Sequence, residues 1–131
     1  MCLKIIRRDH IRLLCVDDDQ VVVDWLVTTL SAVGYEVEVA PNGFIALMKV
    51  SKSPQRFGLI VTDLRMPGLD GFEFIEQSRA AGYDGKFLVY AASITPDARL
   101  RLRELRVERI IEKPVRGGGL IDAVREIESG F

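Results

Sequence analysis

Short apolar segments alternate along the whole chain with segments suited to helices. The apolar segments predict strands over residues 11–16, 35–40, 57–62, 86–92 and 109–112. The intervening segments, of which the first has the clearest helical spacing, predict helices over residues 20–33, 43–51, 72–81, 96–106 and 119–127. Most of the strands are continuously apolar, which is typical of a parallel sheet covered by helices on both faces. We therefore predict an α/β fold with a doubly wound, five-stranded parallel sheet.

Length and charge narrow the class of protein. The 131 residues, 48% of them hydrophobic, suffice for one core, so we predict a single domain over residues 1–131. Lysine and arginine number 18 and the acids 19, so no basic field is present to hold nucleic acid. No apolar stretch approaches the roughly 20 residues of a membrane span, and charges interrupt the start of the chain before a signal-peptide core. With only Cys2 and Cys15, the sequence predicts a reduced, cytoplasmic protein.

Charged residues stand at the ends of three predicted strands. Residues 17–19 are all aspartates and follow the first strand, Asp63 follows the third, and Lys113 follows the fifth. Ligands of open α/β sheets bind outside the carboxyl ends of the strands, so we expect these side chains to meet there. Converging carboxylates repel one another unless a cation neutralises them. Mg²⁺ fits, because it takes oxygen ligands and commonly shares its site with a phosphate.

Asp63 is the candidate nucleophile of this site. A carboxylate can attack phosphorus to give an aspartyl phosphate. Charge in that transition state spreads over the equatorial phosphoryl oxygens, where a metal ion and an ammonium lower its energy. Asp63 stands alone at its strand end, so we predict that it accepts the phosphoryl group while Lys113 binds it.

These residues resemble the receiver domain of bacterial response regulators, the phosphorylated proteins of two-component signal transduction. The likeness rests on Asp17-Asp18, on Asp63 followed by LRMPGLDG, and on Lys113-Pro114, which occur in the family's order. It covers residues 11–127. The resemblance implies a flavodoxin-like sheet with strand order 2-1-3-4-5. It also implies a phosphorelay function, in which a sensor histidine kinase or phosphotransfer protein phosphorylates the domain and a conformational signal follows.

The resemblance assigns a role to each site residue. Asp18 matches the direct Mg²⁺ ligand, Asp17 the ligand that acts through water, and the carbonyl of Arg65 the third protein ligand beside Asp63. Lys113 matches the phosphoryl-binding lysine, which usually precedes a cis proline bond. A domain of this kind is not an enzyme in the ordinary sense, since it catalyses only its own phosphorylation and dephosphorylation.

The sequence departs from the family's pattern at two switch positions, and Arg106-Val107 also replace the Gly-Ala that usually precedes the last strand. Counting back 22 residues from Lys113 places Ala91 where most receivers have threonine or serine, and Ile110 stands at the usual aromatic position. The hydroxyl and aromatic pair that reports phosphorylation is therefore missing, and the signal must travel differently or be weaker. These departures keep open an alternative, a receiver-like interaction module that is not phosphorylated. Arg65 and Ser93 flank the route of attacking water and are expected to tune the lifetime of the phosphoryl group.

Other interpretations of the same residues are weaker. We assign Asp19 to the N-cap of the first helix and Asp70 to an ordinary turn. A phosphatase of the haloacid dehalogenase kind needs a second acid two residues after the nucleophile, where Arg65 stands. A flavin-binding sheet needs a phosphate-binding loop in place of the acidic residues 17–19.

Arginines form a stripe on the helix before the last strand. Arg99, Arg103 and Arg106 lie on one side of it, opposite Leu102 and Leu105. Most such stripes are solvated faces. In receiver domains, however, this helix forms the usual output surface together with the last strand and the last helix. We therefore expect an effector domain or protein with an acidic segment to bind around Arg99, Arg103 and Ile110, and the same resemblance allows a homodimer.

Overall fold

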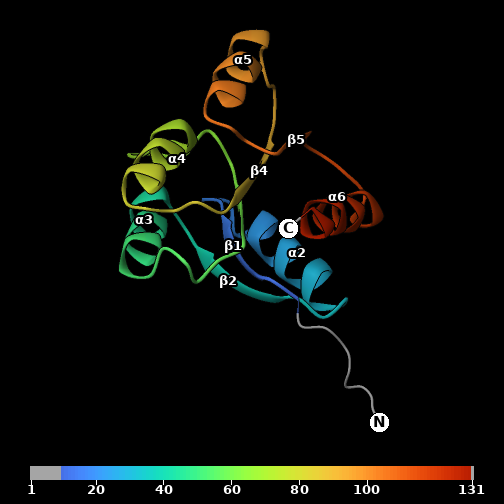
Figure 1. The fold of residues 1–131 in the computed structure, drawn as a ribbon. Coiled ribbons are helices and arrows are strands. Elements are labelled where there is room, and N and C mark those ends of the chain that lie inside the picture. The colour runs from blue at the N-terminus through green and yellow to red at the C-terminus, as the bar shows by residue number, and fades with distance from the viewer. Residues whose placement is uncertain (1–9, 131) are drawn as a thin grey trace.

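The computed structural model describes residues 10–130 and contains one five-stranded sheet between two layers of helices (Figure 1). The strands are β1 (Arg12–Val16), β2 (Glu36–Ala40), β3 (Leu59–Thr62), β4 (Lys86–Ala91) and β5 (Arg109–Glu112). The helices are α2 (Gln20–Ser31), α3 (Gly43–Lys52), α4 (Gly71–Ala80), α5 (Pro96–Glu104) and α6 (Gly117–Ser129). The strand order is β2-β1-β3-β4-β5 and all neighbouring pairs are parallel, which confirms the predicted fold class. The interpretations of Cys2 and of the charged start of the chain lie outside the described residues.

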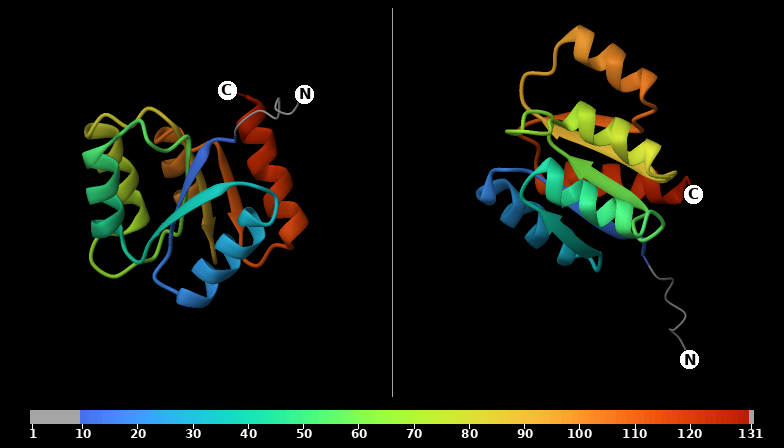
Figure 2. Two further views of the ribbon diagram at one scale, coloured as in Figure 1. Left: turned by 90° about the horizontal axis from the view of Figure 1, so that it is seen from below. Right: turned by 90° about the vertical axis from the view of Figure 1, so that its left-hand side faces the viewer.

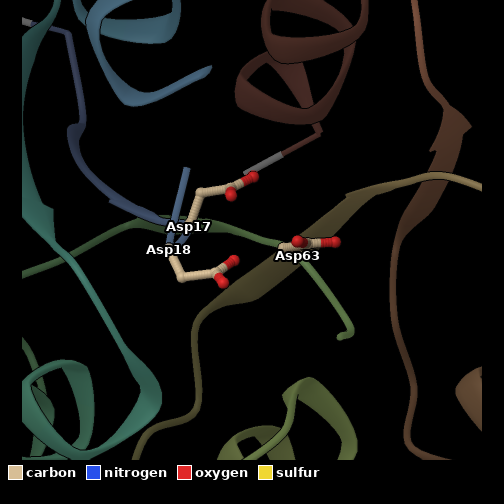
Figure 3. Close-up of side chains that lie close together, drawn as sticks. All are labelled: Asp17, Asp18 and Asp63. Carbon is tan, nitrogen blue, oxygen red and sulfur yellow. The ribbon is translucent and has the colours of Figure 1, made fainter. Parts of the chain in front are cut away.

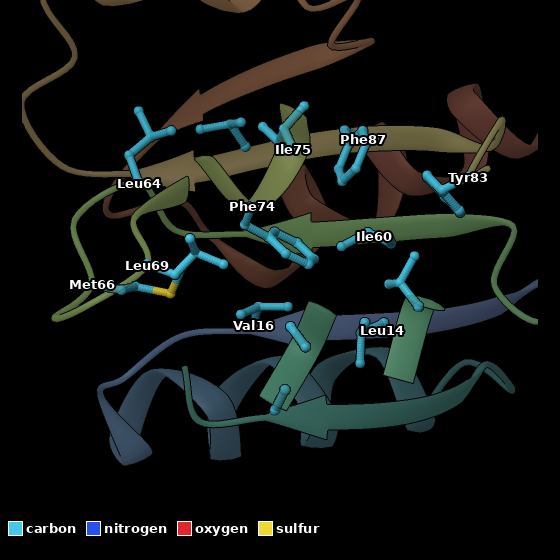
Figure 4. Packing of buried hydrophobic residues seen from close by; sticks show 14 of the residues in the cluster. Leu14, Val16, Ile60, Leu64, Met66, Leu69, Phe74, Ile75, Tyr83 and Phe87 are labelled. Atoms are coloured by element: carbon cyan, nitrogen blue, oxygen red, sulfur yellow. The ribbon is translucent and has the colours of Figure 1, made fainter. Parts of the chain in front are cut away.

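The sheet separates two hydrophobic clusters. Helices α2 and α6 cover one face of it, and α3, α4 and α5 cover the other (Figure 2). Side chains of β1 alternate between the two clusters: Leu14 and Val16 face the α3–α4 side (Figure 4), and Leu13 and Cys15 face the α2–α6 side. Each central strand is thus buried on both faces, as its continuous apolar sequence predicts. No helix among the described residues combines the length and the apolar character that crossing a membrane requires.

Cys15 is a core residue. Its side chain is fully buried, and burial followed by the nearby charge of Asp17 raises the pKa of its thiol to about 12. The thiol therefore stays protonated at neutral pH and packs as a small apolar group.

Polar side chains fix where the helices begin. Asp19 accepts a hydrogen bond from the amide of Val21 (3.0 Å) and caps α2, as predicted. Asp70 does more than an ordinary turn residue: it accepts from the amide of Glu73 (2.9 Å), whose carboxylate accepts in return from the amide of Asp70 (3.1 Å). This reciprocal capping box sets the first turn of α4 directly after the loop that follows Asp63.

All five helices differ from their predicted ranges by one or two residues at one end or both, and two of these differences concern the arginine stripe and the glycines before the last helix. Helix α5 ends at Glu104 because Arg106 adopts a positive φ of 61°, and the carbonyl of Arg106 accepts a hydrogen bond from Arg79 Nη2 (3.3 Å). Arg106 therefore lies beyond the helical stripe of Arg99 and Arg103. Helix α6 begins at Gly117, so Gly117 and Gly118, which the sequence places before the helix, join Gly119 in its first turn.

Candidate functional site

Three carboxylates meet at the carboxyl edge of the sheet (Figure 3). Asp17 and Asp18 directly follow β1, and Asp63 directly follows the neighbouring strand β3. The sheet ladder continues into this edge, since the amide of Asp63 donates to the carbonyl of Val16 (3.0 Å). One carboxylate oxygen from each aspartate lies within 4.8 Å of the others. Asp19 caps α2 and is not part of this group.

Lys113 extends into this group from the end of β5. Its Nζ lies 2.8 Å from Asp17 Oδ2 and 3.6 Å from Asp63 Oδ2. Its amide donates to the carbonyl of Ala91 (2.9 Å), which fixes the lysine backbone beside the end of β4. The bond to Pro114 is cis, as the resemblance implies. The structure thus brings together the aspartates and the lysine that the sequence places at strand ends.

The charges at this edge are not balanced. Three carboxylates against one ammonium leave two negative charges when all four groups are ionised. Burial, followed by the charge of Asp17, raises the pKa of Asp63, although the ammonium of Lys113 opposes the shift. Burial alone would lower the pKa of Lys113, but its hydrogen bond to Asp17 and the negative charges of Asp17 and Asp63 outweigh that and raise it. Lys113 is therefore held in its charged form.

The donor set suits a hard divalent cation. The site offers carboxylate oxygens, carries uncompensated negative charge, and has one exposed member, Asp18, through which solvent reaches it. These are the properties that Mg²⁺ sites require. Asp17 is 2% exposed, and its two oxygens already accept from the amide of Asp19 (2.9 Å) and from Lys113.

The loop after Asp63 depends on a close backbone approach. Asp63 Oδ1 accepts from the amide of Leu64 (2.8 Å), and the carbonyl of Leu64 accepts from the amide of Gly71 (2.8 Å). A Cβ at Gly71 would lie 2.3 Å from the carbonyl oxygen of Asp63, so only glycine fits at this position. Arg65, two residues after Asp63, has an exposed side chain in the same loop.

Ala91 and Ile110, the two switch positions that depart from the receiver pattern, lie at the end of β4 and within β5. Ala91 is the last residue of β4, is 1% exposed, and pairs with Glu112, the residue before Lys113. Ile110 is half-buried and packs against the cluster on the α3–α5 side. Ser93 lies in the loop after β4, is exposed, and has a positive φ of 51°.

The sequence interpretation missed two aromatic residues near the site. The ring centroid of Tyr90 lies 5.5 Å from Lys113 Nζ, and the ring of Trp25 stacks on it at 5.8 Å. Tyr90 looks in the sequence like any apolar strand residue, and Trp25 like any core-facing helix residue. No sequence signal links either of them to the lysine, because the contacts form only when β4, β5 and α2 come together.

The arginine stripe borders a shallow cleft. The cleft has a volume of about 280 Å³ and is lined by Arg99, Arg103, Val107, Glu108, Arg109 and Ile110. Arg99 also pairs with Glu112 (3.3 Å) at the end of β5. The cleft therefore places exposed guanidinium groups beside the half-buried Ile110.

Comparisons with known proteins agree with this geometry. A family model described as the response regulator receiver domain matches residues 13–125. The response regulator MprA of Mycobacterium leprae is 34% identical over 116 residues, which cover 88% of this chain and 50% of the relative. MprA of Mycobacterium sp. strain KMS is 36% identical over 104 residues, covering 79% and 44%.

Solved structures give the same result. The chemotaxis protein CheY4 of Vibrio cholerae has a TM-score of 0.82 at 28% identity, covering 90% of this chain and 98% of that one. The non-phosphorylated receiver domain of HemR from Leptospira biflexa has a TM-score of 0.82 at 30% identity, covering 90% and 94%. The chain spans about half the length of the curated relatives it matches. It belongs to the response regulator receiver domain family of two-component systems.

Proposed function

We propose that this chain is a phosphorylatable receiver domain, a single domain over residues 1–131 that accepts a phosphoryl group on Asp63. One observation carries the proposal: a carboxylate oxygen of Asp63 lies 3.6 Å from the ammonium of Lys113, and the Asp63 carboxylate is grouped within 4.8 Å with those of Asp17 and Asp18. Receiver domains are signalling modules, so the chemistry proposed for this chain is limited to its own phosphorylation and dephosphorylation.

The proposed reaction transfers a phosphoryl group from a phosphohistidine. An oxygen of Asp63 attacks phosphorus, a P–O bond forms as the P–N bond breaks, and the electron pair of that bond stays on the imidazole nitrogen. Asp63 Oδ1 is engaged by the amide of Leu64, which favours Oδ2, the oxygen 3.6 Å from Lys113 Nζ, as the attacking atom. The ammonium would then bind a phosphoryl oxygen and stabilise its charge.

Asp18, Asp63 and the carbonyl of Arg65 are the proposed protein ligands of Mg²⁺, with Asp17 acting through water. The bound ion would neutralise charge on the phosphoryl oxygens. The indirect role of Asp17 is supported by its burial and by its existing bonds to Lys113 and to the amide of Asp19. The exposure of Asp18 supports a direct role.

Incubation of the chain with Mg²⁺ and acetyl phosphate tests the proposal. We expect intact-mass spectrometry to detect one added phosphoryl group, and we expect Asp63→Asn to abolish it. Asp70→Asn is the matched control, because Asp70 lies in the same loop but caps α4, and asparagine is an equally good cap. An adduct that persists in Asp63→Asn, or none in the unaltered chain, would contradict the proposal.

The alternative is a receiver-shaped adaptor that is never phosphorylated. It is favoured by Ala91 and Ile110, which lack the hydroxyl and the aromatic ring of the usual switch. It is disfavoured by the complete set of aspartates and lysine, since an adaptor has no need of it. Partner binding that is indifferent to Asp63→Asn and to beryllofluoride would support the adaptor.

We propose as partners a sensor histidine kinase or phosphotransfer protein in the cytoplasm, and an effector domain or protein that binds around Arg99, Arg103 and Ile110. The cleft beside Ile110 exposes guanidinium groups that an acidic segment would pair with. Reversing Arg99 and Arg103 to glutamate should weaken effector binding at least tenfold in a pull-down or titration. We also propose that the same surface can form a homodimer. Light scattering in the presence of Mg²⁺ and beryllofluoride would detect it as a doubled mass.

A further inference from the structure

Lys113 has three neighbours of different kinds at the site. Its Nζ contacts Asp17 (2.8 Å) and Asp63 (3.6 Å), and it lies 5.5 Å from the ring centroid of Tyr90. An ammonium within about 6 Å of an aromatic face is attracted by the ring quadrupole. The lysine side chain is half-buried, which strengthens this attraction relative to an exposed pair.

Tyr90 connects the lysine to two further elements. It is 5% exposed and lies in β4, one residue before Ala91. Its hydroxyl accepts a hydrogen bond from the amide of Val115 (3.4 Å), in the segment between β5 and α6. Its ring stacks on the indole of Trp25 in α2, with centroids 5.8 Å apart and planes 28° apart. Helices α2 and α6 contact each other on this side of the sheet (Figure 1).

Under the proposed function, phosphorylation of Asp63 gives Lys113 a new negatively charged partner. In this structure its closest partner is Asp17, whereas a phosphoryl group on Asp63 brings negative oxygens that compete for the same ammonium. The methyl group of Ala91 cannot bind a phosphoryl oxygen, and Ile110 on the opposite face has no aromatic ring to move. A displacement of the Lys113 ammonium would change its cation–π attraction to the ring of Tyr90.

We propose that Tyr90 is a positioning residue for Lys113, and that Tyr90 and Trp25 transmit phosphorylation of Asp63 to the α2–α6 side of the sheet. The inference rests on the proposed function, because the change begins with phosphorylation of Asp63. It explains how a receiver without the usual hydroxyl and aromatic pair still reports its state. Trp25 is half-buried, so a change at its ring alters a surface that a partner can contact.

The emission of Trp25 provides a direct test, because it is the only tryptophan of the chain. With Mg²⁺ and beryllofluoride, we expect the fluorescence of the full chain to change. Tyr90→Phe keeps the ring and should keep the change. Tyr90→Leu removes the ring, so it should lose the change and slow adduct formation from acetyl phosphate about fivefold.

Tyr83→Leu is the matched control, since Tyr83 is a buried tyrosine in the other hydrophobic cluster. It should keep both the emission change and the rate of adduct formation. If an adduct forms in the unaltered chain but Trp25 emission stays constant, or if Tyr90→Leu keeps the full change, the inference is wrong and the proposed function stands. If no adduct forms at all, the proposed function itself fails.

A second measurement does not depend on the folding of Tyr90→Leu. In the unaltered chain, the ring resonances of Tyr90 should shift when Mg²⁺ and beryllofluoride are added, while those of Tyr83 should stay in place. Unshifted Tyr90 resonances in a chain that carries the adduct would overturn the inference.

Discussion

At the scale of single residues, the surroundings of Asp63 oppose the ionised form of its carboxyl group. Burial and the carboxylate of Asp17 raise the pKa of Asp63, and the ammonium of Lys113 offsets them only in part. A raised carboxyl pKa means that the ionised form destabilises the fold above the pKa of the unfolded chain, and that this cost is relieved as the pH falls through the folded value. The repulsion among the carboxylates therefore lowers the stability of the metal-free chain.

Asp63→Asn should accordingly stabilise the metal-free chain. We expect urea unfolding in EDTA to give a free energy of unfolding higher by about 1 kcal/mol, since the amide removes the repulsion but still accepts from the amide of Leu64. Added Mg²⁺ should stabilise the unaltered chain more than the variant. Asp84→Asn, at an exposed position, should change neither quantity. A lower stability of Asp63→Asn in EDTA would contradict the argument.

The sequence allows the site residues to be predicted where they directly follow a strand, because the strand end then determines their position. The rule that ligands gather at carboxyl ends of strands suffices to bring Asp17, Asp63 and Lys113 together. It does not distinguish the three consecutive aspartates, whose separation depends on the turn into α2. It also gives no sign of Tyr90 beside Lys113, because strand alternation specifies a face of the sheet and not a contact with a neighbouring strand's lysine.

At the scale of elements, the junction between β3 and α4 holds the site in shape. The amide of Gly71 donates to the carbonyl of Leu64, and no atom larger than hydrogen fits on its Cα. The capping box at Asp70 and Glu73 fixes the same turn. The position of Asp63 thus depends on an element that begins eight residues later in the chain.

Gly71→Ala should disturb both stability and phosphorylation. Its Cβ would lie 2.3 Å from the carbonyl oxygen of Asp63 and 2.7 Å from the Cα of Leu64, so the loop must shift. We expect a loss of about 2 kcal/mol in urea unfolding and a slower reaction with acetyl phosphate. Gly118→Ala is the control, since nothing lies within 4 Å of the added carbon in the first turn of α6. It should leave the reaction unchanged and stabilise the chain slightly.

Element boundaries were predictable where the residues themselves signal them. Thr95 and Pro96 start α5 as expected, because Thr95 accepts from the amide of Ala98 (3.1 Å). The end of α5 was not predictable, since Arg106 has no glycine-like signal for its positive φ. That turn is held by Arg79, which donates to the carbonyls of Gly85 (2.7 Å) and Arg106. The contact between Arg79 and Arg106 spans 27 residues, so the local sequence periodicity does not indicate it.

At the scale of the whole molecule, Glu128 joins the end of α6 to the start of β1. Its carboxylate accepts from the amide of Ile11 (3.0 Å) and from the hydroxyl of Tyr35 (2.8 Å), and it pairs with His10 Nδ1 (3.1 Å). The sequence gives no indication of this group, whose members are separated by up to 118 positions. Burial alone would raise the pKa of Glu128, but these hydrogen bonds outweigh that and lower it.

The lowered pKa of Glu128 makes the free energy of unfolding depend on pH with the opposite sign to the effect of Asp63. Its contribution to stability is present above the unfolded carboxyl pKa and is lost as the pH falls through the folded value. Glu128→Gln should therefore lower the free energy of unfolding by about 1 to 2 kcal/mol at neutral pH, and the difference should shrink in acid. Urea titrations at neutral pH and near pH 3 measure both. Glu104→Gln, on the exposed side of α5, is the control, and an equal loss at both pH values would refute the assignment.

Among residues 10–130, the open strand order leaves β2 and β5 as outer strands, each with one row of backbone groups that pairs with no other strand. Both are short, and both carry charge: Glu36 and Glu38 on β2 pair with Arg12 and Arg56, and Arg109 of β5 pairs with Glu126. Exposed strand edges invite pairing between copies, and charged side chains on them oppose it. The charges along both outer strands therefore oppose the joining of sheets between copies of this domain, a route by which exposed strand edges lead to aggregation.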